Sequence, residues 1–189
     1  DVYKRQEFTL SRKDPAYVGL AKEIHKAQEA LMDGKDPVTV KPELAEIMDE
    51  IHVQFPQAAN DNIGFGSTIF AVKPGDGSAR EQAASCQKVL GGWANIANEY
   101  ATKRYRSNLI NWGMLPFVIP DGDLPFSNHD YLFFPGIRKA VEEKAAEITG
   151  YVVDANGLKP FTVTLGELTD EERQIILKGC LINYNRVEK

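Results

Sequence analysis

The stretch that most constrains the fold is a turn at residues 73–77, whose sequence Lys-Pro-Gly-Asp-Gly contains two glycines. An apolar, β-branched run over residues 67–72 precedes this turn, and a helical pattern over residues 78–90 follows it, which predicts strand, turn and helix. The glycines let a ligand approach the backbone closely, and a helix N-terminus carries about half a positive charge. Arg80, near the start of the predicted helix, adds a planar guanidinium suited to a carboxylate or phosphate. The turn therefore predicts an anion site.

The same residues also allow a structural interpretation. Ser78 followed by Glu81 three positions later has the spacing of a capping box, in which the two side chains satisfy free N–H groups of the first helical turn. Helix caps are common and a single Gly-x-Gly is a weak motif, so the local pattern alone favours the cap. The two roles are compatible, and the sequence leaves both open.

The pattern of strand, helix and strand continues after the turn. Residues 93–97 and 114–119 are short apolar runs typical of buried strands, and residues 100–112 between them have a helical pattern. Alternation of this kind predicts an α/β fold with right-handed crossovers and a parallel sheet. The glycine turn then lies at the carboxyl edge of the sheet, where functional loops of such folds gather.

The rest of the chain is predicted to add helices and a hairpin. Two helices are expected in the first sixty residues, one from Asp14-Pro15 to Gly34 and one from Pro42 to just before Pro56. We expect residues 1–62 to be an N-terminal helical segment and residues 63–189 to be the α/β domain. The later predicted elements are a loop over residues 121–134, a helix over 136–145, a hairpin of 147–153 with 159–165, and a last helix capped by Thr169.

Composition narrows the possible functions. A net charge of -5 argues against a general nucleic-acid binder, and no apolar run has the length of a membrane helix. The two cysteines, Cys86 and Cys180, form neither a disulfide framework nor a zinc pattern, which predicts a reduced, cytoplasmic setting and no metal site in this chain. Cys86 falls within the helix predicted after the turn, where an inert core thiol is the simpler interpretation.

A group of basic residues in the helix predicted over residues 100–112 raises the alternative of RNA binding. Lys103, Arg104 and Arg106 alternate with aromatic residues, as nucleic-acid-binding segments can. On a helix, however, these charges spread over more than one face, which favours a solvated surface over an RNA patch. One of the arginines could still line the anion site.

Four short motifs follow one another between the glycine turn and the third predicted strand. They are Gly75-Asp76-Gly77-Ser78-Ala79-Arg80-Glu81-Gln82-Ala83-Ala84, Leu90-Gly91-Gly92, Ser107-Asn108-Leu109 and Gly113-Met114-Leu115-Pro116. In their order and spacing they resemble the C-terminal swivel domain of the aconitase family, and the small subunit of isopropylmalate isomerase shares the pattern.

The resemblance implies a swivelling β/β/α domain with a small, largely parallel central sheet flanked by helices, plus an N-terminal helical extension and a C-terminal hairpin and helix. It implies a lyase that dehydrates and rehydrates a di- or tricarboxylic hydroxy acid such as citrate or isocitrate, as in tricarboxylic acid metabolism. Ser78 would be the catalytic base. Arg80, Gly77 and Ala79 would bind the substrate.

The resemblance also implies a 4Fe-4S cluster held by three cysteines on other domains. Two cysteines cannot supply three thiolates, so this chain alone is expected to bind no cluster and to be inactive. The implied partner is the cluster-bearing part of the same enzyme, or a separate large subunit. The chain lacks an initiating methionine, and residues 1–6 resemble no start signal, so we expect a detached domain of a larger protein.

Two departures from the family pattern leave the substrate and the activity open. Ala79 stands where the family usually has a second serine. Lys73, with Pro74, stands before the turn in place of the asparagine and aromatic residue that are usual in the family. A second substrate arginine of the family lies upstream of the region represented in this chain, and Arg12 is not assigned to that role. The alternatives are a small subunit of an isopropylmalate isomerase-like dehydratase and a non-catalytic anion- or RNA-binding regulatory domain.

Overall fold

A computed structural model describes residues 14–59 and 62–186 of the chain. The chain divides into two compact units, each built from three separate segments. Unit 1 comprises the residues up to Ser67 with Asp123–Phe134 and Thr149–Phe161, and unit 2 comprises Thr68–Gly122, Pro135–Ile148 and Thr162 onward.

Unit 2 contains the predicted parallel sheet, with strand order β1-β2-β3. The start of β1 lies beside the start of β2, because the Thr68 hydroxyl donates to the Ala94 carbonyl at 2.9 Å. Past the other end of β1, the Val72 carbonyl accepts from Glu99 N at 3.1 Å, so these two strands run in the same direction. β2 and β3 are parallel as well. The strands are β1 (Ser67–Ala71), β2 (Gly92–Ala97) and β3 (Leu115–Val118).

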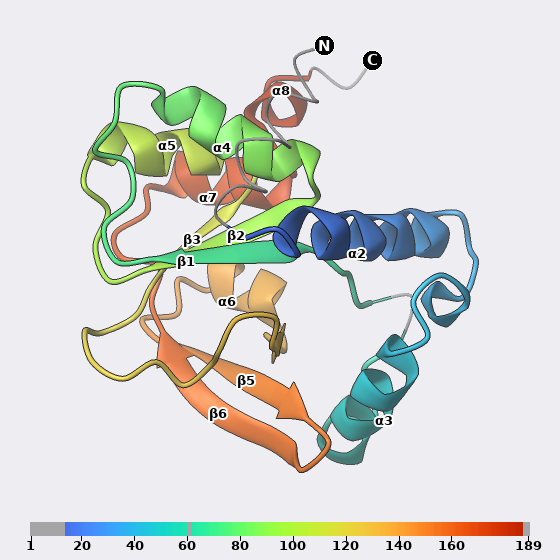
Figure 1. Ribbon diagram of the computed structural model, residues 1–189. Coiled ribbons are helices and arrows are strands. Elements are labelled where there is room, and N and C mark those ends of the chain that lie inside the picture. Colours follow the sequence, from blue (N-terminus) through green and yellow to red (C-terminus); the bar gives the residue numbers. More distant parts are fainter. Residues whose placement is uncertain (1–13, 60–61, 187–189) are drawn as a thin grey trace. The chain divides into compact units, whose positions relative to one another are not determined.

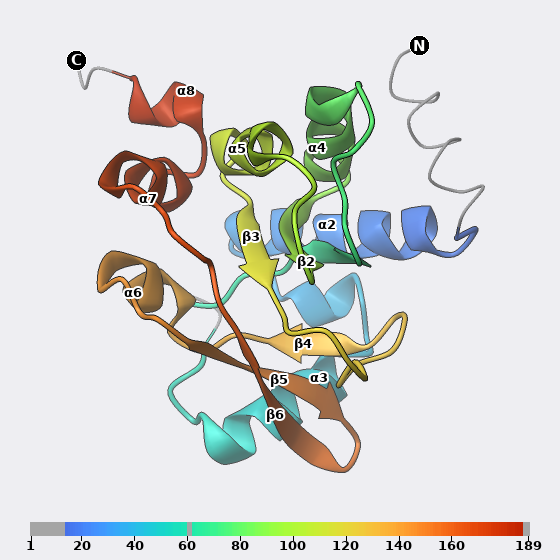
Figure 2. The same ribbon diagram turned by 90° about the vertical axis from the view of Figure 1, so that its left-hand side faces the viewer.

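Helices cover one face of this sheet. α4 and α5 lie side by side on the same face (Figure 1), and their contact with the sheet encloses a core of Ala84, Tyr105, Leu109 and Met114. α7 lies next to α5, and α6 lies next to α7 (Figure 2). The helices of unit 2 are α4 (Arg80–Val89), α5 (Lys103–Asn111), α6 (Ile137–Glu142), α7 (Asp170–Leu177) and α8 (Leu181–Tyr184).

Two glycines far apart in the sequence meet within unit 2. Gly113 has a positive φ of 71°, and a Cβ built on it would lie only 1.8 Å from the Gly179 carbonyl oxygen. No side chain fits in that space, so the end of α5 can approach the turn between α7 and α8 only if residue 113 is glycine. The glycine of the Gly-Met-Leu-Pro motif thus has a packing role.

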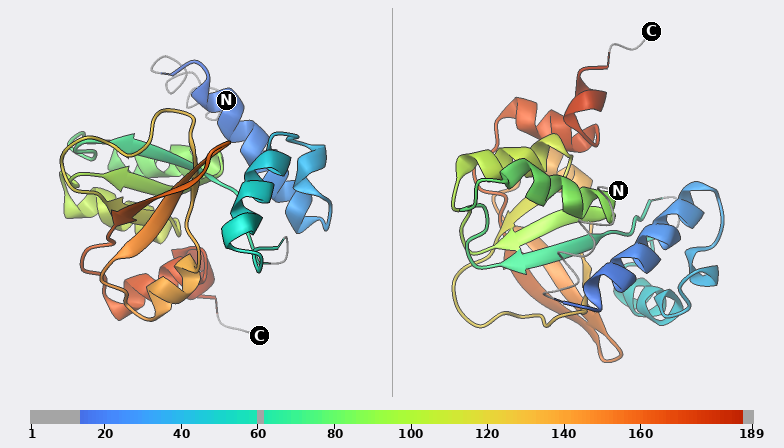
Figure 3. Two further views of the ribbon diagram at one scale, coloured as in Figure 1. Left: turned by 90° about the horizontal axis from the view of Figure 1, so that it is seen from below. Right: turned by 45° about the horizontal axis from the view of Figure 1, so that its top comes forward.

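Unit 1 combines helices with a small sheet of order β4-β5-β6. The segment that joins α2 to α3 contains η1, which packs against both helices (Figure 3). α3 contributes Met48 and Ile51 to a core that also contains Val153 of β5. The elements are α2 (Tyr17–Met32), η1 (Pro37–Thr39), α3 (Leu44–Gln54), β4 (Tyr131–Phe133), β5 (Ile148–Asp154) and β6 (Gly157–Val163).

The predicted fold class is confirmed, with local corrections. The loop predicted over residues 121–134 contains β4, which pairs antiparallel with β5 through Tyr131 and Val153. The predicted hairpin therefore belongs to a three-stranded sheet, because its edge accepts a strand from a distant part of the chain. The division into functional domains at residues 62 and 63 stays a prediction.

Candidate functional site

The glycine turn joins β1 to α4 and is held against the segment that leads into α5. The Pro74 carbonyl accepts from Ala101 N at 2.9 Å. The Gly75 carbonyl accepts from Arg80 Nε at 3.0 Å and from the Thr102 hydroxyl at 3.1 Å. The turn therefore has a defined backbone conformation, fixed by contacts both from its own helix and from the next one.

Gly75 is required by conformation and by space. Its φ is 96°, a region that residues with a side chain rarely adopt, and an added Cβ would lie 2.5 Å from Tyr105 Cβ. Tyr105 is itself fixed, because its phenol oxygen accepts from Gln87 Nε2 at 3.0 Å and from Asn95 Nδ2 at 2.8 Å. Burial raises the pKa of the Tyr105 phenol. The turn thus rests on a rigid polar and aromatic support.

The predicted capping box is wrong. α4 begins at Arg80 with Ala79 as its N-cap, and no side chain caps the helix. Ser78 precedes the N-cap position, so its hydroxyl is not placed to accept from the first turn, and Ala79 has no oxygen to do so. The structural interpretation of Ser78 that the sequence favoured is thereby removed.

The predicted site residues Gly77, Ser78 and Ala79 are all exposed. Unlike Gly75, Gly77 has no positive φ, and a Cβ added to it would meet no atom within 4 Å. The contacts of the described residues therefore give no reason for a glycine at position 77. A missing side chain at an exposed, unstrained position is consistent with close approach of another molecule to the backbone.

Polar groups in this segment are unpaired within the described residues. The Ser78 hydroxyl has no hydrogen-bond partner there, and the backbone N–H groups of residues 76–79 donate to no described residue. These N–H groups lie directly before the first turn of α4, whose positive end favours an anion. The arrangement thus provides the donors that the predicted anion site needs.

Arg80 is partly buried and its side chain folds back over the turn. Only Nε is engaged, with the Gly75 carbonyl, so the two Nη atoms have no partner among the described residues. These are the atoms that a carboxylate engages in a bidentate pair. Lys73, in contrast, is already paired: its Nζ lies 2.9 Å from a Glu99 carboxylate oxygen, and this contact raises the pKa of the lysine.

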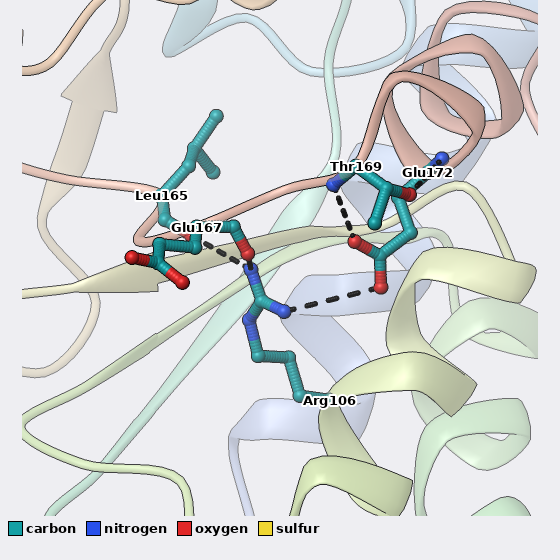
Figure 4. A network of polar contacts seen from close by, with 5 residues as sticks. All are labelled: Arg106, Leu165, Glu167, Thr169 and Glu172. Carbon is teal, nitrogen blue, oxygen red and sulfur yellow. Dashed lines mark hydrogen bonds and ion pairs between the residues drawn. The ribbon is translucent and has the colours of Figure 1, made fainter.

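Arg106 does not line the turn but anchors α5 to the segment before α7 (Figure 4). Its Nη2 donates to the carbonyls of Leu165 at 3.0 Å and Glu167 at 2.6 Å. Its Nη1 lies 4.0 Å from the carboxylate of Glu172. Glu172 also forms a capping box with Thr169, which confirms the predicted cap, although the helix is α7 and α8 follows it. Of the basic group considered for RNA binding, only Lys103 and Arg104 are exposed.

The cysteines do not form a cluster site in the described part of the chain. Cys86 lies within α4, where burial raises the pKa of its thiol, and Cys180 is the N-cap of α8. Residues 14–59 and 62–186 hold no group of three His, Cys, Asp or Glu side chains that could bind a metal ion. Two thiols in the whole sequence do not fit the three thiolate ligands of the cluster that the resemblance implied.

No helix within residues 14–59 and 62–186 has both the length and the apolar content needed to cross a bilayer.

One residue at this site was missed by the sequence analysis. Thr102 is the N-cap of α5 and also contacts the turn through the Gly75 carbonyl. A threonine at the start of a predicted helix is a cap signal, but the predicted helix began at residue 100, which hid the cap. The contact with Gly75 has no local signal because it joins two different loops.

Comparison with known proteins supports the resemblance. Residues 57–122, which include the turn, α4, β2, α5 and β3, match the family described as the aconitase C-terminal domain. No curated protein sequence matches the chain. Among solved structures, the 3-isopropylmalate dehydratase of Methanocaldococcus jannaschii is similar, at 24% identity over 71% of this chain and 73% of that chain, with a TM-score of 0.38. The match over residues 57–122, the region with the glycine turn, is to the family that the motifs of the sequence predicted.

Proposed function

We propose that the chain is the swivel domain of an aconitase-like hydro-lyase that acts on a hydroxy di- or tricarboxylic acid. Ser78 serves as the base, and Arg80 binds a substrate carboxylate. The observation that carries the proposal is that Ser78 is exposed and has no hydrogen-bond partner among the described residues, two positions before Arg80, whose Nη atoms are also unpaired there. Gly77 and Ala79 complete the surface against which the substrate packs.

A serine hydroxyl is a poor base because its own pKa is far above neutral, so its alkoxide needs stabilisation. Three features of the turn provide it: the N–H groups of residues 76–79, the N-terminus of α4, and the positive charge of Arg80. Ser78 then removes a proton from the carbon beside a carboxylate. Departure of hydroxide from the neighbouring carbon leaves a carbon–carbon double bond, and the reverse sequence adds water.

Arg80 orients the substrate relative to Ser78. With Nε bound to the Gly75 carbonyl, the guanidinium plane is fixed relative to the turn, and the two Nη atoms can hold a carboxylate beside Ser78. The chain itself offers no ligand set for a 4Fe-4S cluster, so such a cluster would belong to the partner domains or to a large subunit. The same partner would supply whatever activates the leaving hydroxyl.

The test is an assay of this chain together with its cluster-bearing partner. Hydration of cis-aconitate would support an aconitase-type activity, and dehydration of isopropylmalate would support the isopropylmalate-type alternative. Failure of the loaded assembly to convert either class of acid would contradict the proposal. RNA binding that weakens steeply with salt, and that is lost when Lys103 and Arg104 are replaced, would favour the regulatory alternative.

A further inference from the structure

We infer that Thr102 is a positioning residue for Arg80, an inference that rests on the proposed function for its catalytic consequence. The Thr102 hydroxyl has two partners: it donates to the Gly75 carbonyl at 3.1 Å and accepts from Tyr105 N at 3.2 Å. The accepting contact caps α5, and the donating contact directs the hydroxyl proton toward the Gly75 carbonyl. The side chain therefore links the start of one helix to the turn before another.

The Gly75 carbonyl is the point through which Thr102 acts. A carbonyl oxygen has two lone pairs, and here one donor is Thr102 and the other is Arg80 Nε at 3.0 Å. If the threonine hydroxyl is lost, the carbonyl is held by the arginine alone and can rotate with it. The Nη atoms, which bind the substrate carboxylate, then lose their fixed direction.

Other contacts keep the turn in place but do not fix this carbonyl. Ala101 N holds the Pro74 carbonyl, and the Tyr105 ring packs against Gly75 Cα, so the chain still makes the turn without Thr102. The hydroxyl is thus expected to matter for the orientation of Arg80 more than for folding. This separates a positioning role from a purely structural one.

The first experiment measures how firmly the Arg80 side chain is held, and it does not depend on enzyme activity. The exchange rate of the Arg80 Nε–H proton is followed by NMR in the 189-residue chain, with the signal assigned through its loss in Arg80→Lys. Thr102→Val is expected to speed this exchange about fivefold, the factor that one ordinary hydrogen bond contributes. Thr102→Ser is expected to restore the wild-type rate. Thr102→Ala replaces the valine variant if that variant does not fold.

Thr169→Val is the matched control, because Thr169 caps α7 through the same kind of contact, from Glu172 N at 3.1 Å. It loses a threonine cap without touching the turn, so the Arg80 Nε–H exchange should stay at the wild-type rate. Unchanged exchange in Thr102→Val, or equal acceleration in both valine variants, would overturn the inference.

The second experiment uses the chain assembled with its cluster-bearing partner. Thr102→Val is expected to raise KM about fivefold and to change kcat less, because Arg80 binds the substrate carboxylate. In an Arg80→Lys background the same substitution should have no further effect on KM. Additive effects would contradict the positioning role. An inactive wild-type assembly would refute the proposed function, while the exchange measurement would still decide the role of Thr102.

Discussion

Arg80 Nε donates to the carbonyl oxygen of Gly75 at 3.0 Å, so the first residue of α4 binds back to the turn that precedes its own helix. This contact uses the nitrogen of the guanidinium that a bidentate pair with a carboxylate can leave unused. The side chain is thereby fixed while its two Nη atoms stay available. The relationship between these two residues is the basis for the proposed site.

The two glycines of the turn should respond differently to substitution. Gly75→Ala puts a side chain at a φ of 96° and a Cβ 2.5 Å from Tyr105 Cβ, and is expected to lower the free energy of unfolding by about 2 kcal/mol or more. Gly77→Ala meets no atom within 4 Å and should change it by less than about 0.5 kcal/mol. Urea denaturation measures the free energy of unfolding of both variants. An equal decrease for Gly75→Ala and Gly77→Ala would contradict the described conformation of the turn.

Arg106 should behave as a structural anchor. Arg106→Ala removes the donors to the Leu165 and Glu167 carbonyls, and we expect a loss of about 1–3 kcal/mol of stability. Arg106→Lys should not restore it, because an ammonium lacks the planar fork that reaches both carbonyls.

Arg104→Ala is the control for this pair of variants. Arg104 is exposed and has no hydrogen bond or ion pair within the described residues, so stability should change by less than about 0.5 kcal/mol. Thermal unfolding measures all three variants. A larger loss for Arg104→Ala than for Arg106→Ala would contradict the assignment of the anchor.

Much of unit 2 could be predicted from the sequence because its signals are local. The apolar run of β1, the glycines after it and the helical pattern of α4 each lie within a few residues, and the same holds for β2, α5 and β3. The first and last turns of the helices were less predictable. The predicted start of α4 at Ser78 shifts to Arg80, and that of α5 shifts from residue 100 to Lys103.

Contacts between distant segments could not be predicted. β4 has only three residues, and it forms by pairing with the edge of β5. A strand this short has no clear alternating pattern, and its sequence therefore predicted an aromatic loop. The carbonyl partners of Arg106 lie in a segment that has no visible link to α5 in the sequence. For the same reason the sequence indicated Ser78 and Arg80, which are close to the glycine turn, but not Thr102.

Tyr100 gives a prediction for alkaline pH. Its hydroxyl donates to the carbonyls of Phe117 at 3.0 Å and Asn95 at 3.3 Å, and burial raises the pKa of this phenol. In the unfolded chain a tyrosine ionises near pH 10, while the folded protein keeps Tyr100 protonated. Its contribution to stability is therefore complete below about pH 10 and is lost as the pH rises further.

The measurement is the free energy of unfolding between about pH 9 and pH 11. Tyr100→Phe should be less stable than the wild type at neutral pH, by about 1 kcal/mol for the lost hydrogen bond, and should lose less stability over the alkaline range. Parallel curves for the two proteins would mean that Tyr100 does not resist ionisation.

The most direct test of the account is the rate of substrate hydration by Ser78→Ala in the assembly with the cluster-bearing partner. The Ser78 side chain contacts no described residue by hydrogen bonding, so its removal should leave the thermal midpoint unchanged. We predict a fall in kcat of at least about 100-fold with a similar KM, as expected for the loss of a base that acts in the transition state. A variant that keeps the wild-type kcat would contradict the central claim that this serine performs the proton transfer.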